Sequence, residues 1–533
     1  MPATYAQALV HAARTRPRGL AYTFADQAVS WAELYARARA RAVGLRAHSI
    51  AAGDRVVLLL PAGLELVAMF AAVSLLGGVP AVLNPGLPAA TALARARRLR
   101  PRLVVAATMQ PGLAAADPSL PLAQAEELPR DGDLPAEPPV PDPHDVALLQ
   151  MTSGTTGEPR AVQLSHRAIT AWQRLFSEVY AIGEDDVLCG WAPPWHVMGL
   201  LRFVVLPPFH GCPSHLVPPA VSSLGDWLET LARVGATLTS ATDFSLRHAL
   251  RLVDPSSLDL RRLRLIASGG EPMRLSTLCE FEERVGLPGV VRPAYGLAEA
   301  TMGVTSVRRG EVLRSDDAGN VSCGRPLVGV ELRILDEHGK AVPPGARGEI
   351  VLRSPTLFSG YFEAEDETRQ VLRDGWLYTG DCGRLDEGGE LFVVGRQRLL
   401  IKHAGAAFAP REIEEAVDAV PGVVRSAALG LARGDGREQI VVAAEVTAEV
   451  TTEVTTDIGA TASDSAARLA AQVARAVRDS IGVPPAEVLL LRRGTLPATE
   501  TGKLRHAVFR QRLLQGELTA RELVLGRPDG WTG

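Results

Sequence analysis

A short stretch rich in glycine and hydroxyl residues has the composition of a phosphate-binding loop. It runs from Met151 to Arg160 (MTSGTTGEPR), directly after the apolar segment 145–150. Glycines accept positive φ, so successive backbone N–H groups can converge on an anion, and Arg160 supplies a cation. No Gly-Lys-Ser/Thr follows the glycines, so this is not the common P-loop. We expect phosphate to be held by Thr152, Ser153, Gly154, Thr155, Thr156, Gly157 and Arg160.

Lysine is rare in this chain. Of 56 Lys and Arg residues, three are lysines: Lys340, Lys402 and Lys503. A chain that uses arginine for generic positive charge keeps lysine where a compact ammonium is needed, because a wide guanidinium cannot replace it. Lys340 lies in the turn DEHGK and reads as an ordinary hairpin residue. Lys402 and Lys503 fall inside longer motifs, so they are candidates for chemistry.

Length and composition restrict the function classes. A chain of 533 residues exceeds one small domain, and the net charge of -4 argues against nucleic acid as the main partner. The five cysteines show neither ligand spacing nor a disulfide pattern, which predicts reduced thiols in a cytoplasmic protein. The N-terminus lacks the apolar core of a signal peptide, and the apolar run 56–83 is interrupted by Pro and Gly. We therefore expect no membrane insertion.

Strand and helix signals alternate through the first three quarters of the chain, which predicts an α/β fold with doubly wound sheets. Helices are expected at Trp31–Ala47 and at His166–Tyr180, with Ser165 as the N-cap of the second. Segment 129–143 carries six prolines and reads as a connector. Short strands with Gly and Pro turns over 321–394 predict a small β-barrel-like subdomain.

The last quarter changes character and predicts a separate α+β domain. Its low-complexity stretch 447–458 reads as a surface loop without chemistry. The expected elements are helices over 410–420 and 466–481, strands over 425–431, 439–446 and 488–491, and a final helix from about 504.

Read together, the motifs resemble the adenylate-forming superfamily of acyl-CoA synthetases, fatty acyl-AMP ligases, nonribosomal adenylation domains and luciferases. The resemblance covers nearly the whole chain and rests on five motifs in order: TSGTTGEPR, PAYGLAEAT at 293–301, YTGD at 378–381, GRQRLLIKHAGAAFAPREIE at 395–414 and ETGK at 500–503. It implies an N-terminal domain over 1–394, a hinge at 395–398 and a small mobile C-terminal domain over 399–533. Arg398 departs from the Asp or Lys usual at the hinge.

The implied chemistry is ATP- and Mg²⁺-dependent. Attack of a carboxylate on the α-phosphate makes an acyl-adenylate and releases pyrophosphate. Lys503 would bridge carboxylate and phosphate, because an ammonium offsets the repulsion between two anions. Glu299 looks like the carboxylate ligand of Mg²⁺. Standing alone, Lys503 could instead be an exposed lysine and Glu299 a solvated loop acid.

The resemblance also implies a nucleoside site. Tyr295 would stack on adenine, and Asp381 would accept hydrogen bonds from the ribose hydroxyls. Taken singly, Tyr295 could equally be a core residue and Asp381 a turn residue. The remaining expected contacts are Gly270, Glu271 and Pro272 at the adenine, Gly296 in the tyrosine loop, Ala300 and Thr301 near the α-phosphate, and Arg396 at the ribose.

The substrate is expected to be a hydrophobic carboxylic acid. The segment PPWHVM lacks the aspartate with which amino-acid-activating members pair an α-ammonium. His196 matches a position that gates the acyl pocket, although simple packing explains it equally well. The expected pocket residues are Trp191, Trp195, His196, Met198 and Phe244.

The acceptor of the acyl group stays open. In coenzyme A-using relatives, the loop of Lys402 and Gly405 swings over the site for the second half-reaction. Several segments look most like fatty acyl-AMP ligases of secondary metabolism, which pass the adenylate to the phosphopantetheine of a carrier protein. The alternatives are a complete acyl-CoA synthetase, a separate enzyme for the transfer, and a non-catalytic nucleotide-binding regulator. The oligomeric state is not defined by the sequence.

Overall fold

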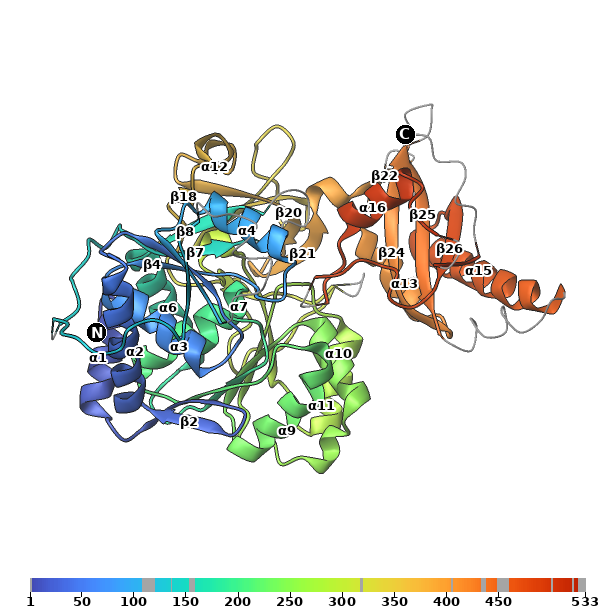
Figure 1. The fold of residues 1–533 in the computed structure, drawn as a ribbon. Coiled ribbons are helices and arrows are strands. Elements are labelled where there is room, and N and C mark those ends of the chain that lie inside the picture. Colours follow the sequence, from blue (N-terminus) through green and yellow to red (C-terminus); the bar gives the residue numbers. More distant parts are fainter. Residues whose placement is uncertain are drawn as a thin grey trace.

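The computed structural model describes residues 2–107, 120–135, 137–152, 159–316, 320–403, 406–432, 438–447, 460–499, 502–519 and 522–525. Figure 1 shows a large body formed by the N-terminal part of the chain and a smaller one formed by its C-terminal part, in orange and red. No helix in these ranges has both the length and the apolar composition that crossing a membrane requires.

Two mainly parallel sheets form the large body. The first has nine strands in the order β15 (Arg325–Pro326), β14 (Thr305–Ser306), β13 (Val291–Tyr295), β12 (Leu265–Ser268), β11 (Leu238–Ala241), β9 (Leu188–Gly190), β10 (Ser214–Leu216), β1 (Leu20–Phe24), β2 (Gln27–Ser30). The second has seven in the order β18 (Gly360–Tyr361), β8 (Ala161–Ser165), β7 (Val146–Met151), β4 (Val79–Val82), β3 (Arg55–Leu59), β5 (Leu103–Ala106), β6 (Leu122–Gln124). This is the predicted doubly wound α/β architecture.

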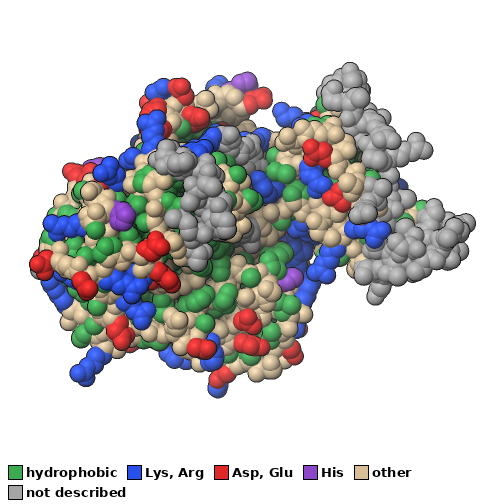
Figure 2. Space-filling view, in the orientation of Figure 1, with side chains coloured by type: hydrophobic (Ala, Val, Ile, Leu, Met, Phe, Trp, Pro, Cys, Tyr) green, Lys and Arg blue, Asp and Glu red, His purple; other side chains and the backbone are tan. Residues whose placement is uncertain are grey.

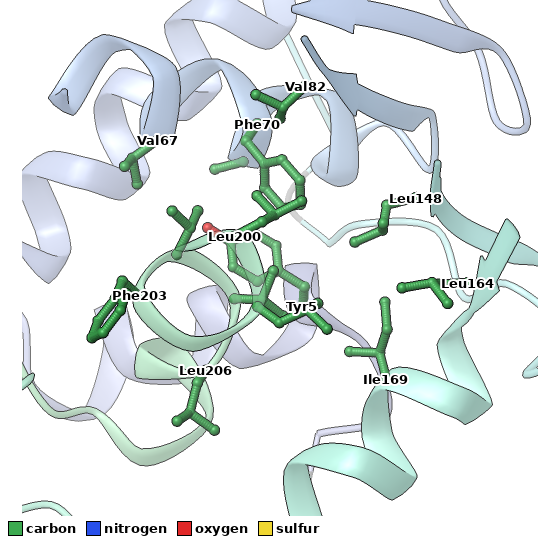
Figure 3. Packing of buried hydrophobic residues seen from close by; sticks show 14 of the residues in the cluster. Tyr5, Val67, Phe70, Val82, Leu148, Leu164, Ile169, Leu200, Phe203 and Leu206 are labelled. Carbon is green, nitrogen blue, oxygen red and sulfur yellow. The ribbon is translucent and has the colours of Figure 1, made fainter. Parts of the chain in front are cut away.

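The core lies between the sheets. Helix α3 (Leu64–Leu75) is apolar on nearly every side and buried along most of its length, as expected of a helix without a solvent face. Figure 3 shows Val67 and Phe70 of this helix beside Val82 and Leu148 of the second sheet and Phe203 of a helical segment. Removing this apolar surface from water is the main stabilising contribution.

The two predicted helices of the large body are confirmed. Helix α2 (Trp31–Ala47) begins with a capping box, in which Ser30 and Glu33 bond each other's backbone N–H. Helix α6 (His166–Tyr180) is capped by Ser165 as expected. The other described helices of this body are α1 (Tyr5–Thr15), α4 (Ala89–Arg98), α7 (Val197–Leu200), a π-helical turn (Leu201–Val205), α8 (Pro207–His210), α9 (Leu224–Val234), α10 (Asp243–Leu252), α11 (Leu275–Val285) and α12 (Glu365–Val371).

The β-rich subdomain is an antiparallel sheet of five strands. Its pairings follow the order β16 (Glu331–Leu335), β17 (Gly348–Arg353), β20 (Trp376–Leu385), β19 (Leu372–Arg373), and β21 (Leu391–Arg396) also pairs with β20. These pairings describe an open sheet, not the closed barrel that short strands suggested. Strand β18 leaves this subdomain and pairs with β8 of the large body.

The C-terminal body is α+β, as predicted. Its sheet has the order β24 (Val423–Ala432), β25 (Glu438–Val446), β26 (Glu487–Leu491), β27 (Leu523–Leu525). Helices α13 (Pro410–Asp418) and α15 (Ala460–Ile481) cover one face, and α16 (His506–Leu514) covers the other. A short hairpin of β22 (Ile401–His403) and β23 (Ala406–Phe408) precedes them. The loop expected over 447–458 lies outside the described residues after Thr447.

Candidate active site

A cleft of about 1040 Å³ lies at the junction of the two bodies. Its lining includes Ser268 at the end of β12 and Tyr295 at the end of β13, and Lys503 from the C-terminal body. Ligands of parallel α/β sheets bind beyond the carboxyl ends of the strands, because loops there bring side chains and free backbone groups together. The cleft is therefore the natural place for a ligand site.

The predicted phosphate loop closes the hairpin of β7 and β8. Thr152 donates its backbone N–H to the Arg160 carbonyl at 2.8 Å, and its hydroxyl accepts from the Arg160 N–H at 3.0 Å. Both residues line the cleft. The other expected phosphate ligands, Ser153, Gly154, Thr155, Thr156 and Gly157, lie outside the described residues.

Glu299 lines the same cleft and is held by a tyrosine. The Tyr361 hydroxyl donates to Glu299 Oε1 at 2.7 Å, and Arg160 lies over the Tyr361 ring at 5.0 Å. Burial raises the pKa of the Tyr361 hydroxyl, and the Glu299 carboxylate raises it further. Tyr361 therefore stays protonated and donates to Glu299.

The surroundings of Glu299 fit Mg²⁺. Among the described residues no group of three or more His, Cys, Asp and Glu could hold a metal. Mg²⁺ does not need such a group, because it is usually bound by one or two carboxylates together with phosphate oxygens and water. A single carboxylate beside a phosphate loop has the right donor chemistry.

Tyr295, Asp381 and Arg396 form one hydrogen-bonded unit. The Tyr295 hydroxyl donates to Asp381 Oδ2 at 2.7 Å, and Arg396 Nε lies 2.8 Å from Asp381 Oδ1. Asp381 and Arg396 are register partners of β20 and β21, so the sheet fixes their spacing. Burial raises the pKa of Tyr295, and the Asp381 carboxylate adds to the shift. Tyr295, Gly296 and Arg396 line the cleft, whereas Asp381 lies behind them, 8% exposed.

Ala300 and Thr301 are not where the sequence suggested. Neither lines the cleft, and both are fully buried. The Thr301 hydroxyl donates to the Thr356 carbonyl at 2.6 Å, because its positive φ of 51° turns the chain away after Glu299. Ala298 lines the cleft in their place.

Of the three residues expected at the adenine from the β12 loop, only Gly270 lines the cleft. Glu271 instead accepts the Phe244 N–H at 2.7 Å and so holds the start of α10. Burial raises the pKa of this carboxyl, and Asp243 adds to the effect. Pro272 is not part of the lining.

Lys503 brings the C-terminal body into the cleft. Its Nζ donates to the Gly270 carbonyl at 3.4 Å, and its backbone is held by Thr499 at 2.8 and 3.1 Å. Burial lowers the pKa of the ammonium below its usual 10.5, and the Arg396 guanidinium lowers it further. The lysine that the sequence singled out therefore meets the predicted nucleotide side of the cleft.

Two of the five expected acyl-pocket residues line the cleft, His196 and Met198. His196 caps α7, where its Nδ1 accepts the Met198 N–H at 3.4 Å. Burial lowers the pKa of His196 to about 4, helped by Lys503, so the imidazole is neutral at pH 7. It can act as a neutral wall of the pocket.

The other three expected pocket residues lie outside the cleft lining. Trp191 is 1% exposed and packs in the core around Trp227. Trp195 is half-buried, and its carbonyl accepts from the Gln150 side chain at 2.9 Å. Phe244 stacks on His248 of α10. Of these three residues only Trp191 is a fully buried core residue, and sequence alone does not distinguish such a residue from a pocket residue.

Lys402 lies away from the cleft in this arrangement. It is exposed on β22, where its backbone N–H donates to Glu438 Oε2 at 2.6 Å. Its expected partner Gly405 lies outside the described residues.

Comparison with known proteins agrees with this geometry. The family described as AMP-binding enzyme matches residues 9–362, about two thirds of the chain. The chain belongs to this family. The C-terminal body that carries Lys503 lies beyond the matched range.

Among relatives of this AMP-binding enzyme is Rv1013 of Mycobacterium tuberculosis (strain ATCC 25618 / H37Rv), a candidate ligase, with 30% identity over 94% of this chain and 98% of that protein. FadD23 of M. tuberculosis (strain CDC 1551 / Oshkosh), a long-chain-fatty-acid–AMP ligase, is 27% identical over 92% and 93%. The structure of o-succinylbenzoate CoA synthetase from Bacillus subtilis with its acyl-adenylate intermediate superimposes with a TM-score of 0.82, at 25% identity over 97% and 99%.

Among the cleft residues of the AMP-binding enzyme that the sequence did not single out are Gln150, Arg202, Ser268 and Tyr361. Tyr361 reaches Glu299 through the pairing of β18 with β8, which no local pattern reveals. Arg202 carried a signal, since it is the one charged residue in the apolar run 197–206. A lone charge there calls for a partner or a ligand.

The two bodies of the enzyme are joined by ion pairs beside the cleft. Arg274 Nη2 donates to Asp418 Oδ2 at 2.8 Å, and Arg247 lies 3.7 Å from the same carboxylate. Arg411 of α13 donates to the Met273 carbonyl at 2.7 Å. Figure 2 shows Lys and Arg side chains, in blue, where the bodies meet. These contacts hold the orientation in which Lys503 reaches the cleft.

Proposed function

We propose that this AMP-binding enzyme activates a carboxylic acid with ATP, forming an acyl-adenylate and pyrophosphate, and then passes the acyl group to a thiol. The observation that best supports this proposal is the hydrogen bond from the Lys503 ammonium to the Gly270 carbonyl, in a cleft that Glu299 and Tyr295 also line. A protein that only bound a nucleotide would not need a second body to deliver this cation.

The reaction joins two anions. One carboxylate oxygen attacks the α-phosphorus of ATP, a new P–O bond forms, and the bond to the β-phosphate oxygen breaks to release pyrophosphate. The like charges of the reactants oppose their approach. A compact ammonium that contacts both offsets this repulsion and orients them, which is the role we assign to Lys503.

The other residues would each bind a different part of ATP. Thr152 and Arg160, with the loop between them, would bind the phosphates that leave as pyrophosphate. Asp381 and Arg396 would bind the ribose, against the Tyr295 ring. Glu299, positioned by Tyr361, would hold Mg²⁺, which offsets phosphate charge when bound.

The second half-reaction requires a different arrangement. Lys402 is exposed and lies away from the cleft lining, so its loop could act there only after the C-terminal body had rotated about residues 395–398. The acceptor would be coenzyme A or a carrier-protein phosphopantetheine. The B. subtilis neighbour is named as a CoA synthetase, and the relative JamA of Moorena producens as a medium-chain-fatty-acid–(acyl-carrier-protein) ligase, so both acceptors have precedent.

Purified protein with ATP, Mg²⁺ and a panel of carboxylic acids tests the proposal. Acid-dependent pyrophosphate release supports adenylation. Adding coenzyme A or a holo carrier protein then separates an acyl-AMP ligase from a complete acyl-CoA synthetase. Nucleotide binding without pyrophosphate release for any acid contradicts the proposal and favours a regulator.

A further inference from the structure

Arg202 is a buried arginine whose guanidinium faces the cleft. It is 7% exposed and lies on the π-helical turn Leu201–Val205, between α6 and the nine-stranded sheet. Phe203 and Leu206 of the same run are buried members of the core, and Figure 3 shows their side chains leaving the helical segment in different directions. The turn thus sends its apolar side chains into the core and its one cation toward the cleft.

The contacts of Arg202 leave its charge uncompensated. Nη1 donates to the Ser240 hydroxyl and, at 3.3 Å, to the Ala267 carbonyl, and the guanidinium lies 4.4 Å from the Phe176 ring centroid. Nε has no hydrogen-bond partner, and Arg202 forms no ion pair within the described part of the chain. A buried cation normally has an anionic partner, because removing it from water is costly.

A second buried donor lines the same cleft. Ser268 follows Ala267 on β12, is 2% exposed and lines the cleft, and its hydroxyl has no partner among the described residues. Ser240 and Ala267 are register partners of β11 and β12, so the sheet fixes this cluster of donors. The cleft wall therefore has two nine-tenths-buried polar side chains with unused donors. Arg202 and Ser268 approach it from opposite faces of β12, because successive side chains of a strand point to opposite faces.

Arg202 lies near enough to Lys503 for one substrate molecule to contact both. Arg202 donates to the Ala267 carbonyl, and Lys503 donates to the Gly270 carbonyl. The positions of these two carbonyls therefore show how far apart the two cations are held. Ala267 and Gly270 are three positions apart in the chain, so their carbonyls lie at most about 10 Å apart. A group bound at Arg202 would thus belong to the acid whose carboxylate meets Lys503.

We propose that the acid substrate carries a second acidic group, a carboxylate or similar anion, which binds Arg202 with the help of Ser268. A guanidinium matches a carboxylate with two parallel hydrogen bonds, and Nε is one of the donors that such a pair uses. This inference rests on the proposed adenylation and narrows its substrate class. It adds a charged anchor to the apolar pocket expected from the sequence.

Matched acids of equal carbon number test the assignment: butanoate against succinate, hexanoate against adipate, and octanoate against suberate. With pyrophosphate release as the readout, the wild type should prefer at least one diacid over its monoacid and its monomethyl ester by about tenfold or more in kcat/KM. Arg202→Met should abolish or reverse that preference and leave the KM for ATP unchanged.

Ser268→Ala tests the same site independently, in case Arg202→Met does not fold. Its hydroxyl has no partner in the described chain, so its loss removes no known protein hydrogen bond. The kcat/KM for the preferred diacid should fall about 3- to 10-fold, and by more than that for the matched monoacid. A binding readout is independent of turnover: the preferred diacid should raise the melting temperature of the wild type but not of Arg202→Met.

The outcomes separate the two proposals. Pyrophosphate release with monoacids as good as diacids, unaltered in Arg202→Met and Ser268→Ala, would overturn the second acidic group and leave adenylation intact. Absence of release with every acid, without diacid-dependent stabilisation, would overturn both.

Discussion

The loop that carries Lys503 rests on the ring of Phe244. Gly502 has φ +84°, and a Cβ placed there would lie 2.3 Å from a carbon of that ring. The ring is held in turn by stacking on His248, with centroids 5.4 Å apart. Phe244 therefore supports the approach of the lysine to the cleft, a role different from the acyl-pocket role that its apolar character suggested.

Gly502→Ala should reduce adenylation about 10- to 100-fold, because the added methyl group collides with Phe244 and displaces Lys503. Gly494→Ala is the matched control, since Gly494 also lies in the C-terminal body with φ +88° but has open space at its Cβ. Both variants carry the same backbone penalty. Equal losses of pyrophosphate exchange in the two variants would show that contact with Phe244 does not position Lys503.

At the scale of elements, α16 begins just after Lys503 and is fixed to α13 by a charged contact. His506 Nε2 lies 2.6 Å from Glu414 Oε1, and both side chains are buried. Burial and the nearby Lys503 lower the pKa of His506, but the Glu414 carboxylate outweighs them and raises it above 6.5. Folding thus favours the protonated imidazole.

The stability from this pair should depend on pH. A pKa raised on folding gives stability that is complete below the unfolded value of about 6.5 and is lost as pH rises through the folded value. We expect His506→Gln to lower the melting temperature at pH 6 and to differ less from the wild type at pH 9. A gap that stays constant or widens toward alkaline pH would show that His506 is not held protonated.

Local signals predicted the elements well. Helices α2 and α6 begin at the residues that the sequence assigned, and Ser165 is the N-cap that it predicted. The family motifs also predicted that Lys503 and Tyr295 serve one site, and both line the same cleft although they come from different bodies. Short-range sequence patterns predict where helices begin and end, and family motifs predict which residues form a site.

What the sequence could not predict depends on distant pairing. Tyr361 reaches Glu299 because β18 joins a sheet built largely from earlier chain. The turn at Thr301 sends its hydroxyl to Thr356, so a polar residue in a site motif was mistaken for a ligand contact. In both cases tertiary contacts determine whether the residue lies in the site or only supports the fold. Local periodicity in the sequence does not reveal such contacts.

At the scale of the whole molecule, the two bodies meet through a compact set of charges. Asp418 of α13 is 5% exposed at its side chain and faces Arg274 and Arg247 of the large body. Burial raises the pKa of Asp418, and Arg274 opposes that shift. Ion pairs at a domain interface can exchange partners when the reaction requires another orientation.

Arg274→Ala should weaken this orientation, because it leaves the buried Asp418 without its nearest cation. We expect adenylation to fall about tenfold or more and the scattering profile in solution to shift toward a more extended particle. Arg261→Ala is the control, as it removes an ion pair with Asp259 whose partners are mostly exposed. Unchanged exchange and scattering in Arg274→Ala would mean that these charges do not set the domain arrangement.

The central claim is that one ammonium from the C-terminal body enables the acid and ATP to react. ATP–pyrophosphate exchange with a turned-over acid tests it in Lys503→Ala beside Lys340→Ala. The exposed Lys340 is not part of the cleft lining, although residues 335–339 of the same turn are. We predict a loss of about 100-fold or more for Lys503→Ala, with a preformed adenylate still bound, and no loss for Lys340→Ala. Exchange at the wild-type rate in Lys503→Ala would contradict the account.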